Sequence, residues 1–151
     1  MKVLVQRVKK AHCYIDNAHF SGIDTGLLLY VSFHQSDTVS LIPKLAEKVA
    51  KLRIFEDAQG KMNLSVKDIG GSVLSISQFT LEASTQKGHR PSFTDALAPD
   101  QASAFYDTFN DALQRLGIPV ARGEFAAYMA IESINDGPVT ILLERRNSND
   151  S

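Results

Sequence analysis

Apolar residues near the start of the chain follow the pattern of β-strands. Residues 1–8 are rich in Val and Leu, and residues 13–15 and 27–33 are further apolar runs of strand length. Turn-forming residues separate these runs, with Asp-Asn at 16–17 and a segment bounded by glycines at 22–26. The first third of the chain is therefore predicted to be rich in β-structure.

Two later segments show the spacing of amphipathic helices. Apolar residues recur at helical spacing through residues 41–52, and a second apolar stripe runs through residues 99–116. Pro99 is suited to the first turn of the second helix, and Gly117 is suited to ending it. Three polar residues are candidate caps for the first helix: Ser36, Asp37 and Ser40.

The middle of the chain contains one further predicted strand and one long loop. Residues 72–81 alternate and then become apolar, as a central strand should, with glycine turns at 57–60 and 70–71 before it. The segment Ser77–Thr80 is thereby predicted to lie toward the C-terminal end of that strand. Residues 84–95 contain Gly and Pro among polar residues and are predicted to be a loop of a length that is often functional.

The C-terminal part is predicted to contain two strands and a tail. Residues 129–134 and 139–143 have strand composition, and Asn-Asp-Gly-Pro at 135–138 is interpreted as the turn that joins them. The polar residues 145–151 are expected to fray. Without a repeat, linker or low-complexity block, the whole pattern indicates one mixed α/β domain.

Composition narrows the class of protein. A chain of 151 residues with 44% hydrophobic and 22% charged residues is typical of a single folded globular domain. Its formal net charge of -1 argues against a protein that holds long nucleic acids through a diffuse positive field. A local patch, such as Lys9-Lys10 or Lys87 with Arg90, remains open as an RNA contact, although solvated surface charge is the simpler interpretation of each cluster.

Targeting signals and thiol chemistry are not visible. The longest apolar run, residues 26–33, is far shorter than the ~20 residues of a membrane span, and no leader pattern precedes a cleavage site. Cys13 has no second cysteine to pair with and is expected to be a buried or incidental thiol. We therefore expect a cytoplasmic protein that contacts no membrane.

The usual arrangements of catalytic side chains are also missing. The segment 70–74 lacks the second glycine of a serine-hydrolase elbow, and no glycine-rich phosphate loop or dinucleotide motif occurs. The four histidines show no zinc-ligand spacing, and Glu56-Asp57 flank a predicted hairpin turn where carboxylates are solvated. No metal or nucleotide cofactor is expected, and catalysis is narrowed to main-chain groups or groups of the substrate.

Two short stretches combine polar groups with positions that are common in active sites. Ser77–Thr80 places two hydroxyls and an amide near the end of a predicted buried strand, where polar groups bond neighbouring loops or bind a ligand. Gly137-Pro138 is ordinarily a turn, and only about one X-Pro bond in twenty is cis in folded proteins. From these residues alone, structural and functional roles stay equally open.

The same stretches belong to a set of motifs that runs along the chain. The set comprises Gln6-Arg7-Val8, Arg53-Ile54-Phe55 with Gly60-Lys61-Met62-Asn63, Ser77-Gln78-Phe79-Thr80-Leu81, Arg90-Pro91-Ser92-Phe93, Gly123-Glu124-Phe125 and Asn135-Asp136-Gly137-Pro138-Val139-Thr140. With these motifs the chain closely resembles the D-aminoacyl-tRNA deacylase family from residue 1 to about residue 144. Six separate stretches in the expected order argue against coincidence.

The resemblance implies both a fold and a reaction. The expected fold is a single α/β domain over residues 1–145, with a mixed β-sheet curled into a partial barrel, two main helices packed on it, and a flexible tail at 146–151. The expected protein is a homodimer that hydrolyses the ester bond of D-aminoacyl-tRNA and so releases tRNA and the D-amino acid. Glycine mischarged on tRNA is expected to be accepted, and L-aminoacyl-tRNA to be rejected.

The resemblance also assigns the selection of chirality. Gly137 and Pro138, joined by a cis peptide bond, are expected to reach into the active site of the other subunit. There the two carbonyl oxygens beside the bond crowd the position of an L side chain, so that rejection is steric. Arg7 corresponds to the arginine that holds this motif in orientation.

The catalytic pocket is implied by the remaining motifs. Ser77, Gln78, Phe79 and Thr80 match the residues that receive the aminoacyl group, and three others match wall positions: Phe125, Met129 and Ala102. Main-chain N–H groups around Phe79 and Thr80 are expected to bind the oxyanion of the ester. Water assisted by the terminal 2'-hydroxyl of the tRNA is the preferred nucleophile, and Thr80 is the alternative, although its motif contains no base to activate it.

Two departures and two rival functions complete the sequence analysis. Asp24 and Ala126 stand where the family more often has glycine, and Ala126 bears on how well glycine on tRNA is processed. The first rival is a tRNA-binding module without hydrolytic activity. The second is a purely structural dimerising protein in which both stretches are ordinary turns.

Overall fold

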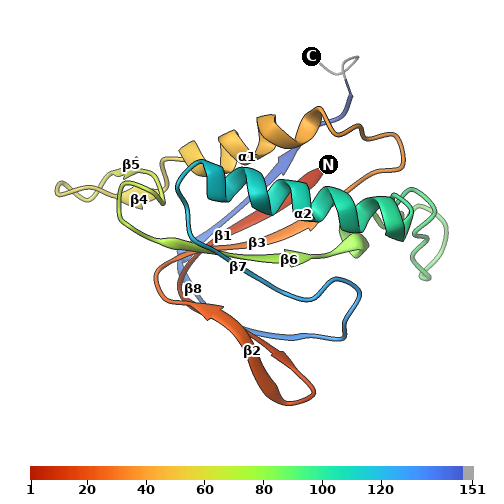
Figure 1. Cartoon of the computed structure of the whole chain (residues 1–151), viewed down its shortest axis with the longest axis horizontal. Helices are drawn as coiled ribbons and strands as arrows, with labels where there is room; N and C mark the ends of the chain where they lie inside the picture. The colour runs from red at the N-terminus through yellow and green to blue at the C-terminus, as the bar shows by residue number, and fades with distance from the viewer. Residues whose placement is uncertain (148–151) are drawn as a thin grey trace.

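The apolar N-terminal run forms β1 (Lys2–Ile15), the strand around which the sheet is built (Figure 1). The computed structural model describes residues 1–147. The sheet has the order β2-β1-β3-β6-β7, and β8 pairs with β1 as well. The other strands are β2 (Ala18–Ile23), β3 (Gly26–Ser32), β6 (Ser72–Ser77), β7 (Val120–Arg122) and β8 (Ala130–Glu144).

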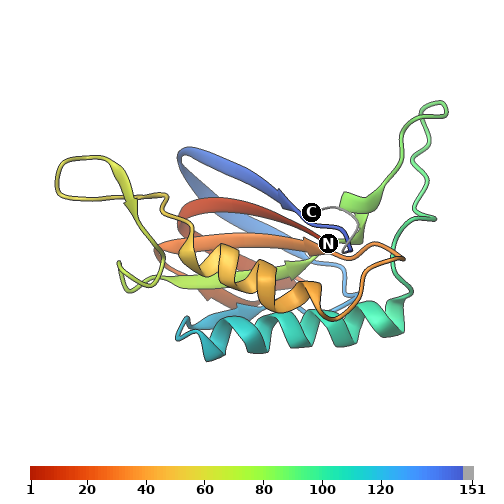
Figure 2. The same cartoon turned by 90° about the horizontal axis from the view of Figure 1, so that it is seen from above.

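Two helices cover one face of this sheet. Strands β3, β6 and β7 are parallel to one another, so each connection between them is a crossover. These crossovers contain α1 (Leu41–Lys51) and α2 (Pro99–Arg115), which lie next to each other on the same side (Figure 2). The larger hydrophobic core lies between them and the sheet and includes Val3, Leu29 and Phe109.

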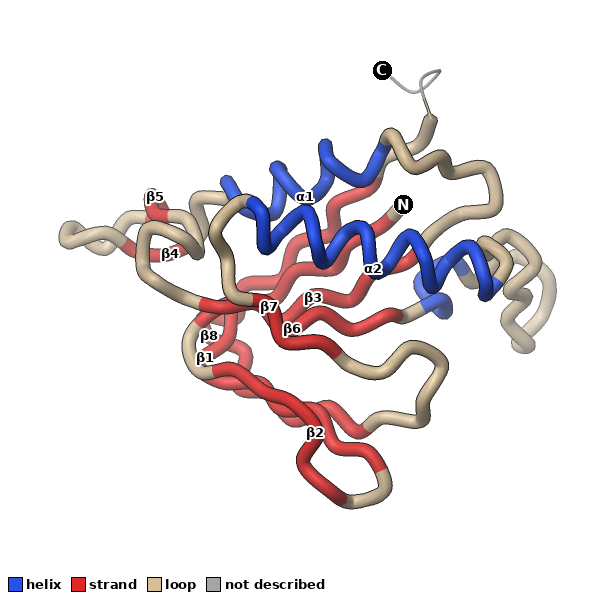
Figure 3. The backbone as a smooth tube through the Cα atoms, viewed as in Figure 1, coloured by secondary structure: helices blue, strands red, loops and turns tan. Residues whose placement is uncertain are grey.

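The opposite face of the sheet curls around a second, smaller core. This core contains Leu28, Leu74 and Ile76. Ser21 of β2 donates a hydrogen bond from Oγ to the carbonyl oxygen of Arg122 in β7 at 2.7 Å, which joins the two ends of the strand order. The predicted α/β domain with a partial barrel and two packed helices is therefore confirmed (Figure 3).

The N-terminal third has the turn predicted at 16–17, but the turn predicted at 22–26 is too long, because β2 continues to Ile23 and β3 begins at Gly26. Asp16 and Asn17 both have positive φ, 52° and 64°, as the two-residue turn of a hairpin requires. The strand predicted at 13–15 is wrong as a separate element, because these residues are the C-terminal end of β1. A register shift between Val8 and Lys10 places exposed lysines in the middle of the strand, and these polar residues interrupt its apolar pattern.

The strand predicted over residues 72–81 is too long. Strand β6 ends at Ser77, and the chain then turns into a short 3-10 helix, η1 (Phe79–Glu82). Gln78 still donates its main-chain N–H to Val31 at 2.8 Å, so the sheet contact ends one residue later than the strand. Apolar Phe79 and Leu81 extended the pattern of a strand although they belong to a helical turn.

The prediction that residues 135–138 form a turn between two strands is also wrong. Both flanking segments belong to one strand, β8, which runs antiparallel to β1 throughout. The register jumps from Gln6 opposite Thr140 to Val8 opposite Asn135, so four residues of β8 bulge out opposite Arg7. Turn-forming residues produce this bulge as readily as a chain reversal, and local sequence does not distinguish the two outcomes.

The helices and the remaining loops agree with prediction. Gly117, with φ of 88°, follows the end of α2. Ser40 occupies the cap position of α1 without a capping hydrogen bond from its side chain to the helix, whereas Asp37 accepts the His34 N–H at 2.7 Å. The predicted turn at 57–60 connects the small hairpin β4 (Phe55–Glu56) and β5 (Met62–Leu64).

The end of the described chain packs against η1 and the segment before α1. The guanidinium of Arg146 lies 3.4 Å from a carboxylate oxygen of Glu82, and Asn147 accepts the main-chain N–H of Thr38 at 3.2 Å. Most of the tail predicted at 146–151 lies outside the described residues, so that part stays a prediction. Within residues 1–147, no helix has the length and apolarity that a membrane crossing needs.

Candidate active site

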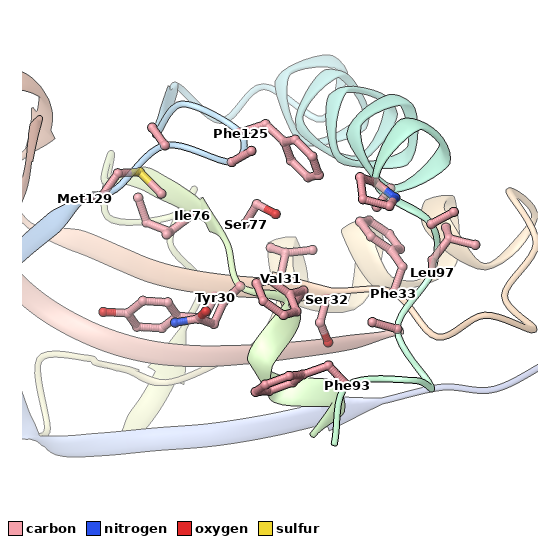
Figure 4. A pocket seen from close by; sticks show the side chains of 18 of the residues that line it. Tyr30, Val31, Ser32, Phe33, Ile76, Ser77, Phe93, Leu97, Phe125 and Met129 are labelled. Carbon is pink, nitrogen blue, oxygen red and sulfur yellow. The ribbon is translucent and has the colours of Figure 1, made fainter. Parts of the chain in front are cut away.

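A pocket of about 560 Å³ lies where β3 and β6 end and η1 begins. The start of α2 and the segment between β7 and β8 complete its walls. Figure 4 shows Ser77 near the centre, Met129 on one side of it, Phe33 and Leu97 on the other, and Phe125 across the opening. Most of the surface that a ligand would contact is therefore apolar.

Six of the predicted site residues line this pocket. They come from three separate parts of the chain: Ser77, Gln78 and Phe79 from the end of β6, Ala102 from α2, and Phe125 and Met129 from the segment after β7. The fold thus brings together motifs that are about fifty residues apart in the sequence. Thr80 is exposed and does not line the pocket, but its carbonyl oxygen accepts the Ala83 N–H at 3.1 Å within the same turn.

The other three predicted residues form a separate cluster. The guanidinium of Arg7, which is 7% exposed, donates from Nε to the carbonyl oxygen of Asp136 at 3.1 Å and from Nη1 to that of Ile54 at 2.8 Å. A Cβ built on Gly137 would lie 3.0 Å from Nη2 of Arg7. The Gly137-Pro138 peptide bond is cis, as expected, and both residues are exposed.

The two clusters are well separated within one chain. Ser77 pairs with Val31, which pairs with Val3, whereas Gly137 lies in the bulge opposite Arg7. Val3 and Arg7 are four residues apart along β1, and β6 and β8 are three strand spacings apart across the sheet. Together these displacements give a separation of roughly 20 Å between Ser77 and Gly137. In both views the bend of β8 and η1 lie toward opposite ends of the molecule (Figures 1 and 2).

The residues that line the pocket carry almost no ionisable groups. Among its described lining residues, the titratable side chains are the phenols of Tyr30 and Tyr128, without a carboxylate, imidazole, amine, guanidinium or thiol. Burial raises the pKa of Tyr30, so this phenol stays protonated at neutral pH. A ligand in this pocket therefore meets hydroxyls, amides, aromatic rings and main-chain groups.

The main-chain N–H groups at the start of η1 form one polar feature of the site. The first hydrogen bond of this turn runs from the Leu81 N–H to the Gln78 carbonyl oxygen at 3.2 Å. The N–H groups of Phe79 and Thr80 precede it, and they have no hydrogen-bond acceptor among residues 1–147. They are available to a ligand atom that accepts hydrogen bonds.

A buried carboxylate supports this turn from below and was missed by sequence reasoning. Glu82 is 3% exposed, and its Oε2 accepts the hydroxyl of Ser32, a pocket residue, at 2.7 Å. Lys2 lies 3.7 Å from the same carboxylate and donates to the Leu81 carbonyl oxygen at 2.9 Å. These contacts fix η1 to β1 and β3, and no local pattern indicated that Glu82 is buried.

An aromatic pair forms the outer rim of the pocket. The rings of Phe79 and Phe93 meet edge to face, with centroids 5.2 Å apart, and are 56% and 38% exposed. Phe93 belongs to the predicted loop at 84–95, which is thereby part of the site (Figure 4). Exposed aromatic side chains at a pocket mouth can stack on flat ligand groups.

The histidines lie outside this site, although two of them form a pair that their spacing did not reveal. His12 Nδ1 and His19 Nε2 are 3.0 Å apart because the β1–β2 hairpin brings them together. The part of the chain that the structure describes contains no group of three or more potential metal ligands. Cys13 is buried, as predicted, and burial raises its pKa.

Comparison with known proteins identifies the family of this chain. The family model for D-Tyr-tRNA(Tyr) deacylase matches residues 4–144. Proteins named D-aminoacyl-tRNA deacylase from Shouchella clausii and Deinococcus radiodurans are 54% and 52% identical over 144 residues, covering 95% of this chain and 99% of each relative. Among solved structures, a c-Myc DNA unwinding element binding protein superposes with a TM-score of 0.92 at 37% identity, covering 97% of this chain and 99% of that one.

A more distant structure shares the fold. A probable eukaryotic D-amino acid tRNA deacylase superposes with a TM-score of 0.81 at 17% identity, covering 94% of this chain and 97% of that one. With matches over nearly the whole sequence, the chain belongs to the D-Tyr-tRNA(Tyr) deacylase family. Within that family, its curated relatives at about half identity are enzymes named D-aminoacyl-tRNA deacylase.

Proposed function

We propose that this protein hydrolyses the ester bond between tRNA and a D-amino acid, releasing free tRNA, as a cytoplasmic proofreading enzyme. The family and the names of its relatives support the reaction. The observation that carries the mechanism is the pocket itself, because phenols are the only titratable side chains among its described lining residues. Such a pocket suits a reaction in which the substrate supplies the reactive hydroxyl.

The main-chain N–H groups of Phe79 and Thr80 stabilise the oxyanion that forms when the ester carbonyl is attacked. They lack acceptors among the described residues and lie beside pocket-lining Gln78 and Phe79. A positioned donor of this kind is worth roughly 3 kcal/mol or more in the transition state of hydrolases. Ser32 and Glu82 hold the turn that presents these donors.

Water is the nucleophile, and the 2'-hydroxyl of the terminal ribose assists it. The water oxygen bonds to the carbonyl carbon, the bond from that carbon to the ribose oxygen breaks, and the water proton passes to the ribose oxygen. Thr80 is the less suitable nucleophile because its side chain is exposed and does not line the pocket. No residue of the pocket needs to ionise.

Chirality is selected by Gly137-Pro138 of a second copy in a homodimer. The support is that this bulge is exposed, is held by Arg7, and lies roughly 20 Å from its own pocket when strand spacings are added. Ile134 and Leu142, on either side of the bulge in β8, are 46% and 54% exposed and suit a contact with another subunit. Glycine has no side chain to exclude, so glycyl-tRNA is a second substrate.

The decisive experiment compares D-tyrosyl-tRNA with L-tyrosyl-tRNA on the purified protein. The proposal expects release of D-tyrosine and nearly intact L-tyrosyl-tRNA. Binding of both substrates without turnover would instead establish the rival tRNA-binding module. A D-tyrosyl-tRNA with a 2'-deoxy terminal adenosine tests the assistance step separately, because an unchanged rate with it contradicts a role for the 2'-hydroxyl.

A further inference from the structure

A second hollow, of about 530 Å³, lies along the exposed side of α1 and is lined mainly by cations. We call it the basic hollow and define it by Lys44, Lys48, Lys51, Arg53 and Arg145. Its walls come from the helix, from the two residues that follow it, and from Arg145, which follows β8. The proposed reaction uses none of these side chains.

Positively charged side chains are more concentrated around this hollow than over the rest of the chain. Five of the sixteen Lys and Arg residues line it, but only one of the acidic residues within residues 1–147 does. That acid, Glu47, pairs with Lys51 at 2.6 Å. No carboxylate within residues 1–147 pairs with Lys44, Lys48 or Arg145, so this surface is locally positive on a protein whose net charge is -1.

Helix-end electrostatics explain only part of this cluster. Lys48 and Lys51 lie in the last turn of α1, where cations are favoured by the helix dipole. Lys44 lies near the opposite end, where the dipole disfavours a cation, and Arg53 and Arg145 are outside the helix. The gathering of cations from three segments around one hollow therefore calls for an anionic ligand.

The basic hollow is connected to Gly137-Pro138 indirectly, through Ile54 and Arg7. Arg53 lines the hollow and is followed by Ile54, whose carbonyl oxygen accepts a hydrogen bond from Nη1 of Arg7. Arg7 also donates a hydrogen bond from Nε to the carbonyl oxygen of Asp136, the residue before Gly137. The end of α1 and the bend of β8 lie at the same end of the molecule, away from η1, in both views (Figures 1 and 2). A subunit that donates Gly137-Pro138 to its partner therefore brings its basic hollow toward the same partner pocket.

We propose that the basic hollow binds the phosphate backbone of the tRNA whose aminoacyl end occupies the pocket of the other subunit. This inference rests on the proposed function and on its homodimer. Lysine and arginine side chains that neutralise phosphates release counterions, so their contribution to affinity falls as salt rises. Each subunit would then contribute the pocket for one tRNA and the phosphate contacts for the other.

The test uses the full-length protein with the double substitution Lys44→Gln and Lys48→Gln. These exposed lysines lie one helical turn apart, and their loss leaves the apolar face of α1 unchanged. We expect KM for D-tyrosyl-tRNA to rise roughly tenfold at physiological salt, and the slope of log KM against log salt to decrease by about one to two. The kcat should be unchanged, as should hydrolysis of D-tyrosyl-adenosine, which carries the ester without the tRNA body.

A matched control removes two other exposed cations, with Lys67→Gln and Arg115→Gln. These residues line neither pocket, so KM for D-tyrosyl-tRNA should stay within about twofold of wild type, far below the change expected for phosphate contacts. An equal loss in both double variants, or an equal loss on D-tyrosyl-adenosine, overturns the assignment of the hollow. If the wild type hydrolyses D-tyrosyl-tRNA and the Lys44→Gln, Lys48→Gln variant has the same KM, this inference alone is refuted. If the wild-type protein is inactive on both substrates, the proposed function is refuted.

Discussion

Arg7 binds the main-chain carbonyl oxygen of Asp136 through its guanidinium at 3.1 Å, one residue before Gly137. The same side chain reaches Ile54 at 2.8 Å, so a single buried arginine joins the bulge of β8 to the start of the small hairpin. A planar guanidinium can serve two acceptors in fixed directions, which an ammonium on a flexible stem does less well. The orientation of the proposed filter thus depends on one residue of β1.

The first prediction concerns this arginine. Arg7→Lys keeps the positive charge but loses one of the two hydrogen bonds, which should lower the free energy of unfolding by about 2 kcal/mol. Because Gly137 is then held less firmly, the ratio of D- to L-tyrosyl-tRNA hydrolysis should fall roughly tenfold, equivalent to about 1.4 kcal/mol. Denaturant unfolding and parallel rate measurements on the two substrates check both effects. Gln6→Ala, which removes a neighbouring exposed contact to Thr140, is the control and should preserve the ratio.

The second prediction separates backbone strain from crowding at Gly137. Gly137 and Gly60 both have positive φ, 127° and 75°. A Cβ on Gly137 would lie 2.9 Å from a Val139 methyl and 3.0 Å from Arg7, whereas Gly60 has nothing within 4 Å. Gly137→Ala should therefore displace Arg7 and reduce discrimination against L-tyrosyl-tRNA, in addition to losing stability. Gly60→Ala should lose about 1 kcal/mol of stability and keep full discrimination, and a loss of discrimination there would contradict the steric argument.

A feature of the fold or site can be predicted from the sequence when the residue pattern that produces it lies within one continuous segment. The stripes of α1 and α2 repeat over many residues, so helical periodicity located both helices closely. The end of β6 and the bulge of β8 were misjudged, because a 3-10 turn with apolar residues resembles a strand, and Gly-Pro suits a bulge as well as a turn. The pocket residues were found only through the family motifs, since their proximity is created by strand pairing and not by spacing.

Features without a local signature were missed altogether. Glu82 looks like an ordinary surface carboxylate in the sequence, and its burial results from η1 folding back onto Ser32. The pairing of His12 with His19 depends on the register of the β1–β2 hairpin, which shifts by one residue between Cys13 and Tyr14. Such contacts depend on strand register and on which distant segments pack together, and neither can be deduced from local patterns in a single sequence.

The third prediction concerns pH. A catalytic imidazole or carboxylate would produce an inflection in the pH dependence of kcat between about pH 5 and 8. Described pocket residues contribute only phenols, and burial raises the pKa of Tyr30 above its ordinary value of 10.0, so this group is still protonated over that range. The logarithm of kcat should therefore stay flat over that range of pH, in the wild type and in Tyr30→Phe alike. Single-turnover rates across this range check the expectation, and a bell-shaped profile would contradict it.

The last prediction tests the strained residue in the pocket wall. Ala126 has φ of 66°, a conformation that costs a residue with a Cβ about 1 to 2 kcal/mol, and it lines the pocket next to Ala127. Glycine removes this strain but loses about 0.5 to 1 kcal/mol through the greater freedom of the unfolded chain. Ala126→Gly should therefore be neutral to stabilising by about 1 kcal/mol.

Ala127, whose φ is not positive, provides the matched comparison at the next position. Ala127→Gly removes no strain and should destabilise by about 0.5 to 1 kcal/mol, so the two variants should differ by about 1 to 2 kcal/mol in denaturant unfolding. Equal stabilities would show that the backbone at 126 is relaxed. Because Ala126 belongs to the pocket wall, the rate on glycyl-tRNA relative to D-tyrosyl-tRNA should shift in Ala126→Gly and by less in Ala127→Gly, since the released backbone changes the wall only at the strained position.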